Sequence, residues 1–133
     1  MCYLGGQGTF TPCHKDLCAS FGHNIMTWAE ADSSAFWFMT ASSDAAAACK
    51  YYQEQFGLEL DWETHVTDVE QFASAPFPVY VVEQKLGDLI LVPSRSCHQV
   101  VNRGGLTMKI SWSRMTMQGL EAALWHELPI YRR

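Results

Sequence analysis

The sequence predicts a mainly β fold, a small β-barrel or double-sheet jelly roll with two inserted helices and a C-terminal helix. Short strand-forming runs recur along the chain, separated by glycine, proline and polar turn signals. Two helix-forming stretches interrupt these runs midway, and a third follows the last of them. Many short strands spaced in this way are typical of jelly rolls, whose mouths can hold a metal and a small molecule.

Length and composition are those of a small globular domain. The 133 residues are 48% hydrophobic and 17% charged, which is too apolar for a disordered chain. We expect one domain over residues 1–133, with the barrel at about 3–115 and the C-terminal helix at about 117–128. Because the chain starts abruptly within a strand, we expect it to be part of a longer protein.

Charge and hydropathy argue against two classes of partner. The formal net charge is -5, so we expect no direct nucleic-acid binding by this domain, and a basic peptide suits the charge better. No apolar run reaches the length of a membrane helix, so no membrane partner is expected. The N-terminus also lacks the layout of a signal peptide.

The five cysteines are expected to be free thiols. Their number is odd, they form no C-x-x-C pair, and no secretory signal precedes them, so a reducing compartment is expected. Cys13 and Cys18 flank a His-x-Asp pair, which leaves structural zinc as an alternative. Structural zinc usually has four closed ligands with paired cysteines, so buried free cysteines are the preferred interpretation.

The N-terminal third is expected to form four strands. The glycine-rich stretch at residues 5–8 suits a tight turn that pairs the first two strands, and residues 17–22 are expected to be a loop. Pro12 predicts a bend or bulge, because proline donates no ladder hydrogen bond. The apolar run from Ala35 is typical of a strand buried on both faces. The expected strands are Cys2–Leu4, Thr9–His14, Asn24–Ala29 and Ala35–Thr40.

Two helices are expected between the fourth and fifth strands. Ser43 is the expected N-cap of the first helix and Gly57 its terminator. An apolar stripe at helical spacing supports this helix, and it comprises Ala45, Ala48, Cys49, Tyr52 and Phe56. Thr67 and Glu70 predict a capping box at the start of the second, shorter helix, which is expected to end before Pro76.

The C-terminal half returns to strands and ends with a helix. Gly87-Asp88 predicts a hairpin turn between two of these strands. The expected strands are Val79–Glu83, Leu89–Val92, His98–Asn102 and Leu106–Trp112. The closing helix carries an apolar face of Leu120, Ala123, Leu124 and Leu128.

A His-x-Asp pair and a distant histidine form the candidate metal site. Successive side chains of an extended segment alternate between faces, so His14 and Asp16 point the same way. Two imidazoles and a carboxylate on one face are the ligand set of a mononuclear non-haem iron site. His98, about 80 residues further along in GDLILVPSRSCHQV, is the best candidate for the second histidine.

These motifs resemble the JmjC domain. The resemblance runs from about Tyr3 to Met115 and rests on TPCHKD, the strand around Asn24, GDLILVP, HQVVN and the glycine turn after it. JmjC domains are cupin-type oxygenases, so the resemblance implies a double-stranded β-helix and the cofactors Fe(II), 2-oxoglutarate and O2. Members of the family hydroxylate protein side chains, or demethylate lysine by hydroxylating its methyl carbon.

Position by position, the resemblance assigns roles to individual residues. His14, Asp16 and His98 match the catalytic iron triad of the family. Thr11 matches a threonine that binds 2-oxoglutarate in the hydroxylase branch. Asn24 matches an asparagine that lines the cosubstrate pocket in the demethylase branch. The two matches come from different branches, so the branch stays open.

One departure concerns the lysine that pairs with the distal carboxylate of 2-oxoglutarate in many family members. The corresponding position here is Ser34 (or Ser33), which carries no charge. Lys109 on the last strand is the expected substitute, with Thr107 or Ser111 assisting if their shared face points into the barrel. If Lys109 points outward, a domain without turnover is expected instead.

The resemblance therefore implies an Fe(II)- and 2-oxoglutarate-dependent dioxygenase that acts on protein side chains. Asn24 and the acidic balance favour a histone lysine demethylase-like activity, with a histone tail as substrate and the nucleus as location. A JmjC protein hydroxylase, a catalytically inactive JmjC-like binding module and a cytoplasmic location are the alternatives. A cupin with another reaction is also an alternative, and a third histidine beside His14 and His98 would indicate it.

Overall fold

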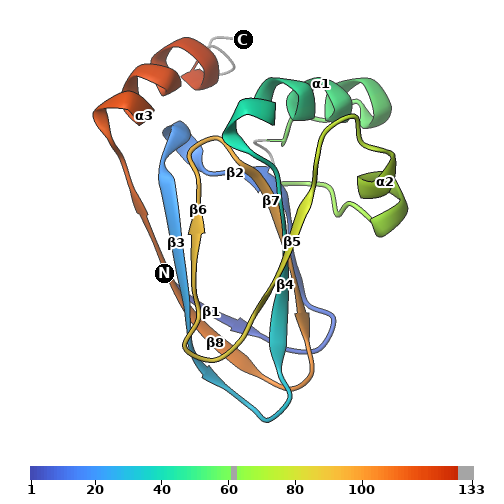
Figure 1. The fold of residues 1–133 in the computed structure, drawn as a ribbon, viewed down its shortest axis with the longest axis vertical. Coiled ribbons are helices and arrows are strands. Elements are labelled where there is room, and N and C mark those ends of the chain that lie inside the picture. Colours follow the sequence, from blue (N-terminus) through green and yellow to red (C-terminus); the bar gives the residue numbers. More distant parts are fainter. Residues whose placement is uncertain (61–62, 129–133) are drawn as a thin grey trace.

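Two antiparallel four-stranded sheets face each other and form a barrel (Figure 1). The structure, a computed structural model, describes residues 1–60 and 63–128. The strand order is β1-β8-β3-β6 in the first sheet and β2-β7-β4-β5 in the second. The predicted fold class, a mainly β jelly roll of the cupin type with a C-terminal helix, is confirmed.

Each predicted strand is present, with ends that differ from the prediction by at most three residues. The largest difference is at Phe21, where a strand begins inside the predicted loop 17–22. The first sheet comprises β1 (Cys2–Gly5), β8 (Thr107–Arg114), β3 (Phe21–Ala29) and β6 (Leu89–Val92). The second comprises β2 (Phe10–Lys15), β7 (Cys97–Arg103), β4 (Ser34–Met39) and β5 (Tyr80–Gln84).

The chain winds as a double-stranded β-helix. Each strand of the first half pairs with a counterpart from the second half: β1 with β8, β2 with β7, β3 with β6 and β4 with β5. All of these pairs are antiparallel. Segments far apart in the sequence therefore lie side by side, and the His-x-Asp motif at the end of β2 meets the start of β7.

Two predicted hairpin pairings are wrong, although their turns are present. Gly8 and Gly87 have positive φ angles of 75° and 88°, as tight turns require. However, β1 and β2 lie in opposite sheets, and so do β5 and β6. Turn residues specify a local reversal of the chain. Burial of the two sheet faces decides which sheet the next strand joins.

A β-bulge in β2 brings two candidate residues to the same face. Thr11 lies opposite Val100 on β7, and His14 lies opposite His98, with a register shift between the two pairs. Thr11 and His14 are three residues apart, so a regular strand would point them to opposite faces. The extra residue of the bulge returns both to one face. The irregularity predicted at Pro12 is confirmed.

The longer inserted helix, α1, spans Ala45–Phe56. It ends at Gly57, whose positive φ of 66° confirms the predicted terminator. The predicted N-cap, Ser43, is wrong. It lies within a 3-10 turn, η2 (Ser42–Asp44), and Asp44 occupies the N-cap position without a side-chain capping hydrogen bond.

The shorter inserted helix, α2 (Val69–Ser74), begins one residue later than the predicted capping box implies. Asp68 and Gln71 form the capping box, in place of Thr67 and Glu70. The hydroxyl of Thr67 is instead hydrogen-bonded to the buried hydroxyl of Tyr52. A tertiary contact thus engages the first candidate cap, and the next polar residue takes its place.

The C-terminal helix is present as α3 (Met117–Ala122), continued by a π-helical turn, η4 (Ala123–Glu127). Its predicted apolar face is only partly covered, because Ala123 is buried whereas Leu120 and Leu124 are exposed. In Figure 1 this helix lies at the same end of the barrel as α1. None of the helices in the described ranges is long and apolar enough to cross a membrane.

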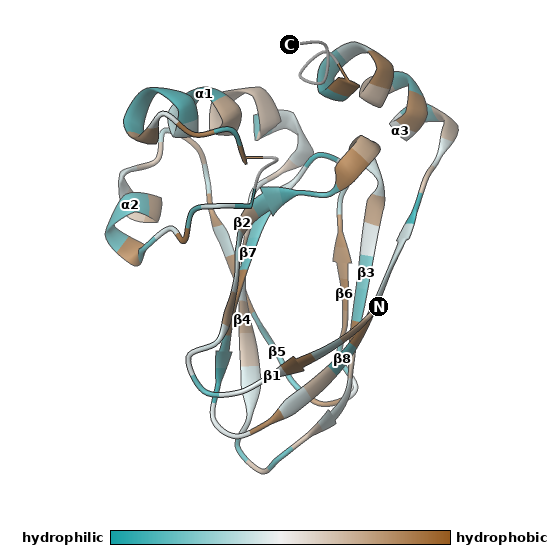
Figure 2. Cartoon of the chain, turned by 180° about the vertical axis from the view of Figure 1, so that it is seen from behind, coloured by the Kyte–Doolittle hydropathy of each residue, from teal (hydrophilic) through white to brown (hydrophobic). Residues whose placement is uncertain are grey.

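Two apolar clusters hold the layers together. One lies between the sheets and includes Met26 with Ile90 and Val92 of β6, a strand that is apolar along its length (Figure 2). The other joins the second sheet to the inserted helices and includes Tyr52 and Phe72. Burial on both sides fixes which side chains of each strand point into the barrel.

A candidate metal centre in the barrel

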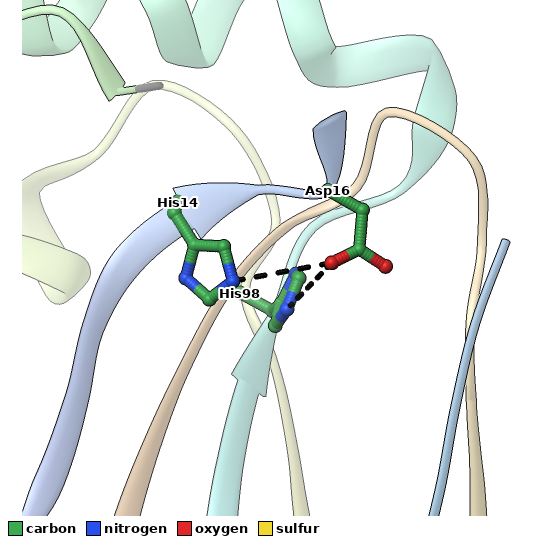
Figure 3. Close-up of side chains that lie close together, drawn as sticks. All are labelled: His14, Asp16 and His98. Carbon is green, nitrogen blue, oxygen red and sulfur yellow. Dashed lines mark ion pairs between the residues drawn. The ribbon is translucent and has the colours of Figure 1, made fainter. Parts of the chain in front are cut away.

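Two imidazoles and one carboxylate meet where β2 ends (Figure 3). His14 lies directly opposite His98, and their ring centroids are 4.2 Å apart. Asp16 follows β2, and its Oδ1 lies 4.0 Å from Nε2 of His14 and 3.9 Å from Nε2 of His98. One possible ligand atom from each residue lies within 4.8 Å of the other two. The structure thus brings the three predicted ligands together.

The backbone orients both imidazoles. Nδ1 of His14 lies 2.8 Å from the carbonyl oxygen of Pro12, and Nδ1 of His98 lies 3.2 Å from that of Ser96. A carbonyl oxygen can only accept, so Nδ1 carries the proton in the neutral form of each ring, and Nε2 has the free lone pair in that form. Both Nε2 atoms face Asp16. Histidine ligands of metals are commonly oriented by such a contact.

Burial affects the protonation of these ligands. It lowers the pKa of His98 to about 3, and the nearby His14 adds to this effect, so His98 is neutral at pH 7. Burial raises the pKa of Asp16, an effect that His14 opposes and Glu63 increases. A bound cation would stabilise the carboxylate form. Two imidazole nitrogens and one carboxylate are a ligand set that fits Fe(II), so these residues could hold it.

Among the described residues, the metal-binding group contains neither a cysteine nor a third histidine. Cys13, next to His14, packs into the cluster beneath α1, where burial raises the pKa of its thiol to about 11. A protonated thiol is not a metal ligand. The geometry therefore supports neither the zinc alternative nor the cupin alternative with three histidines.

A cavity of about 590 Å³ adjoins the three ligands. The four residues predicted to contact the cosubstrate line this cavity from β2, β3 and β8: Thr11, Asn24, Lys109 and Ser111. The volume lies in the usual range of small-molecule sites. A small dicarboxylic acid can therefore fit beside a metal held by the three ligands.

Sequence comparison with known proteins agrees with this geometry. A family model described as "JmjC domain, hydroxylase" matches residues 1–113. The chain belongs to the JmjC family. C-module-binding factor A of Dictyostelium discoideum is 35% identical over 132 residues, which cover 98% of this chain and 13% of that protein. This JmjC chain thus corresponds to a small part of a much longer relative.

Lys109 points into the cavity of the JmjC barrel. It is 4% exposed, and its ammonium donates a hydrogen bond to Oδ1 of Asn102. Burial lowers the pKa of Lys109 to about 8. Ser34 and Ser33, the two candidates for the position of the family's lysine, are both buried, and neither is among the described residues that line the cavity. Thr107, a suggested helper of Lys109, donates its hydroxyl hydrogen to the carbonyl of Gly5 instead.

Two cavity residues received no role from the sequence although their strands were predicted. Asn102 lies four residues after His98 on the same face of β7, so the two-residue period could have identified it. Trp37 belongs to the apolar run for which a strand buried on both faces is predicted. It is buried, but it also lines the cavity and stacks on His98, with ring centroids 5.9 Å apart.

Glu63 and Tyr3 also line the cavity and were missed. Glu63 lies in the segment between α1 and α2, and its Oε1 is 3.9 Å from Nε2 of His14. Such a connecting segment has no periodic pattern, so no signal in the sequence pointed to Glu63. Tyr3 lies on β1, whose register with β8 only the folded sheet defines.

The substitution Gly22→Ala tests the position of Asp16. A Cβ at this glycine would lie 2.5 Å from Oδ2 of Asp16 and 3.0 Å from Cβ of Val92. The carboxylate would have to move, so we expect weaker binding of Co(II), a stand-in for Fe(II), by about tenfold in a titration. Gly6→Ala is the matched control, because a Cβ there meets only Leu106, at 3.6 Å. Unchanged Co(II) affinity in Gly22→Ala would contradict this geometry.

Proposed function

We propose that this JmjC domain is an Fe(II)- and 2-oxoglutarate-dependent dioxygenase that acts on protein side chains, with an activity like that of histone lysine demethylases. The observation that carries the proposal is the group of His14, Asp16 and His98 beside a cavity that contains the buried Lys109. The three ligands suit a ferrous ion, and the lysine suits a carboxylate. Membership of the JmjC family supports the same class of chemistry.

In this proposal the chain binds and orients the reactants. His14 and His98 would contribute nitrogen donors to the metal, and Asp16 would contribute a negative charge. The bound metal and cosubstrate supply the oxidation of a substrate C–H bond by O2, with succinate and CO2 as co-products. No side-chain nucleophile or general base is required. The chain's task is to hold the reactants in order.

Lys109 is the proposed partner of the distal carboxylate of 2-oxoglutarate. A buried ammonium forms strong, charge-assisted hydrogen bonds with a carboxylate. Its position is supported by Asn102, whose Oδ1 accepts from Lys109 and whose Nδ2 donates to Oγ1 of Thr9 at 3.0 Å. The lysine is thereby anchored to β7 as well as to its own strand.

Polar side chains from neighbouring strands are proposed to complete the cosubstrate site. Oδ1 of Asn24 accepts a hydrogen bond from Nε2 of Gln84 at 3.1 Å. The amide nitrogen of Asn24 is therefore the end that can donate to an oxygen of the cosubstrate. Thr11 and Ser111 line the same cavity and offer hydroxyl groups.

Residues that line the cavity suit a substrate side chain with a positive charge. Glu63 and Asp16 both line the cavity, and both raise the pKa of Tyr3, after the larger effect of partial burial. Glu63, which is not a metal ligand in this proposal, and the ring of Tyr3 can attract a cation, and a methylated lysine keeps its positive charge. Exposed Phe10 and Leu17 also line the cavity and suit the aliphatic part of such a side chain.

Two other functions have support from specific observations. Thr11, which resembles a residue of the hydroxylase branch, lines the cavity and favours a JmjC protein hydroxylase as the second candidate. The relative from Dictyostelium discoideum is named as a binding factor, which supports a binding module without turnover as the third. With a histone tail as the proposed substrate, the nucleus is the proposed location.

Binding and turnover of 2-oxoglutarate test the proposed class. Anaerobic addition of Fe(II) and 2-oxoglutarate is expected to give a weak visible charge-transfer band, and admission of air is expected to give succinate. His98→Ala is expected to abolish both, because it removes one of three metal ligands. His126→Ala, which changes an exposed histidine of η4, is expected to retain both. A wild-type protein with neither signal would contradict the enzyme and favour the binding module.

Lys109→Met is expected to raise the KM for 2-oxoglutarate roughly 10- to 100-fold at pH 7, because it removes a hydrogen-bonded charge. Only the protonated lysine attracts the carboxylate, and its pKa is lowered to about 8. The wild-type KM is therefore expected to rise between pH 7 and pH 9, and this rise is expected to be absent in the variant. Lys85→Met, at an exposed lysine, is the control. Equal KM values for Lys109→Met and the wild type would contradict the role of Lys109.

Glu63→Gln tests the cationic substrate. With methyl-lysine peptides, demethylation releases formaldehyde, whereas stable hydroxylation adds one oxygen atom to the peptide mass. The variant is expected to have a KM for the peptide about fivefold above that of the wild type, and this increase is expected to be smaller at high salt. The KM for 2-oxoglutarate is expected to be unchanged. Glu54→Gln on α1 is the matched control, since Glu54 is exposed and does not line this cavity. Hydroxylated peptide without formaldehyde would favour the second candidate.

A further inference from the structure

A buried carboxylate in the C-terminal helix contacts two cations of the barrel. Glu127, the last residue of η4, is 5% exposed. Its Oε2 accepts a hydrogen bond from the ammonium of Lys15, which is also buried, and its Oε1 accepts from Nε of Arg95 at 3.1 Å. Both carboxylate oxygens of Glu127 thus accept a hydrogen bond from a cationic side chain. Burying such charges costs free energy unless they are paired, so the three groups act as a unit.

The two cations stand next to the candidate metal ligands. Lys15 lies between His14 and Asp16 in the chain, and its side chain points to the opposite side of β2. Arg95 lies three residues before His98, in the segment that leads from β6 into β7. One carboxylate therefore joins the two chain segments that supply all three ligands.

A second contact links the same helix to the turn after Asp16. Cys18 and Ala19 in this turn have positive φ angles of 55° and 49°, a conformation that costs free energy for residues other than glycine. The carbonyl oxygen of Ala19 accepts a hydrogen bond from Oγ of Ser94 at 2.6 Å. Gly119 of α3 packs against it so closely that a Cβ there would lie 2.8 Å away. The helix, together with Ser94, thus holds a strained turn in place.

We propose that Glu127 is a positioning residue for the metal centre. It fixes the distance between the segment that carries His14 and Asp16 and the segment that leads to His98. Figure 1 shows the helix over the end of the barrel where β2 ends and β7 begins. Glu127 lies beyond residues 1–113, which the family model matches. This inference rests on the proposed function, because it requires that the three ligands bind a metal.

Co(II) titration of the purified chain tests this role, because the visible bands of Co(II) report the geometry of its ligands. Glu127→Gln is expected to raise the Kd for Co(II) about tenfold or more and to change the intensity of these bands. Glu121→Gln, at an exposed glutamate of α3, is the matched control and is expected to match the wild type. Thermal melting of the metal-free variants shows whether each is folded.

A second variant keeps the test decisive if Glu127→Gln does not fold. The double substitution Lys15→Met with Glu127→Leu removes the two buried charges and keeps apolar volume. Arg95 remains, but its side chain is 24% exposed and can be solvated, so the variant is expected to fold. It is expected to show the same tenfold or greater loss of Co(II) affinity. A folded variant of either kind with a Kd within twofold of the wild type and unchanged bands would overturn the inference. A wild-type chain that binds no Co(II) would instead overturn the proposed function on which it rests.

Discussion

The antiparallel pairing of β2 with β7 is the contact on which the candidate metal centre depends. Its register places His14 opposite His98, and the bulge at Pro12 turns both Thr11 and His14 toward the cavity. A shift of one residue would move His14 to the opposite face of the sheet. The amide of Cys13, within the bulge, donates to the carbonyl of His65 at 2.9 Å. The backbone amide in the bulge therefore has a hydrogen-bond partner, and the bulge is a stable part of the fold.

The polar interior of the barrel is held by a network that pairs its buried groups. Gln84 on β5 is fully buried, accepts from Nε1 of Trp37 at 2.9 Å and donates to Asn24 and to the carbonyl of Asp88. This one amide thereby links the ring that stacks on His98 to a predicted cosubstrate residue. Buried polar groups are costly unless paired, so such a network favours a single arrangement of the cavity walls. A site built in this way is preorganised before any ligand enters it.

The buried ammonium of the cavity comes from β8, whereas the resemblance to JmjC domains implies a lysine near the start of β4 in many members. The resemblance to JmjC domains places Ser34 (or Ser33) at the position of that lysine, whereas Lys109 on β8 points inward, from the other sheet. Strands of both sheets surround the interior, so more than one strand can supply a cation to it. Family membership therefore indicates the class of chemistry. The proposed cosubstrate contact must be argued from the cavity of this chain.

Local patterns in the sequence were sufficient to predict the strands, the helices and the shared face of His14 and Asp16. Alternation, turn residues and helix caps act over a few residues, and their signals are present in the chain itself. The predicted helix caps were wrong at two positions. Ser43 lies within a 3-10 turn, and the hydroxyl of Thr67 is hydrogen-bonded to Tyr52. The predicted partner, His98, was chosen for its context in GDLILVPSRSCHQV about 80 residues further along, which is not a local periodic pattern.

Only the tertiary structure decided which strands pair and that Lys109 points inward. It also decided that Glu63 approaches His14 and that Glu127 pairs with Lys15 and Arg95. These outcomes depend on burial of two sheet faces and on contacts between residues more than 30 positions apart. No local pattern records such contacts, because side-chain packing over the whole core sets the register and the docking of the helix. The sequence alone thus determined the elements and two neighbouring ligands, and the fold determined their surroundings.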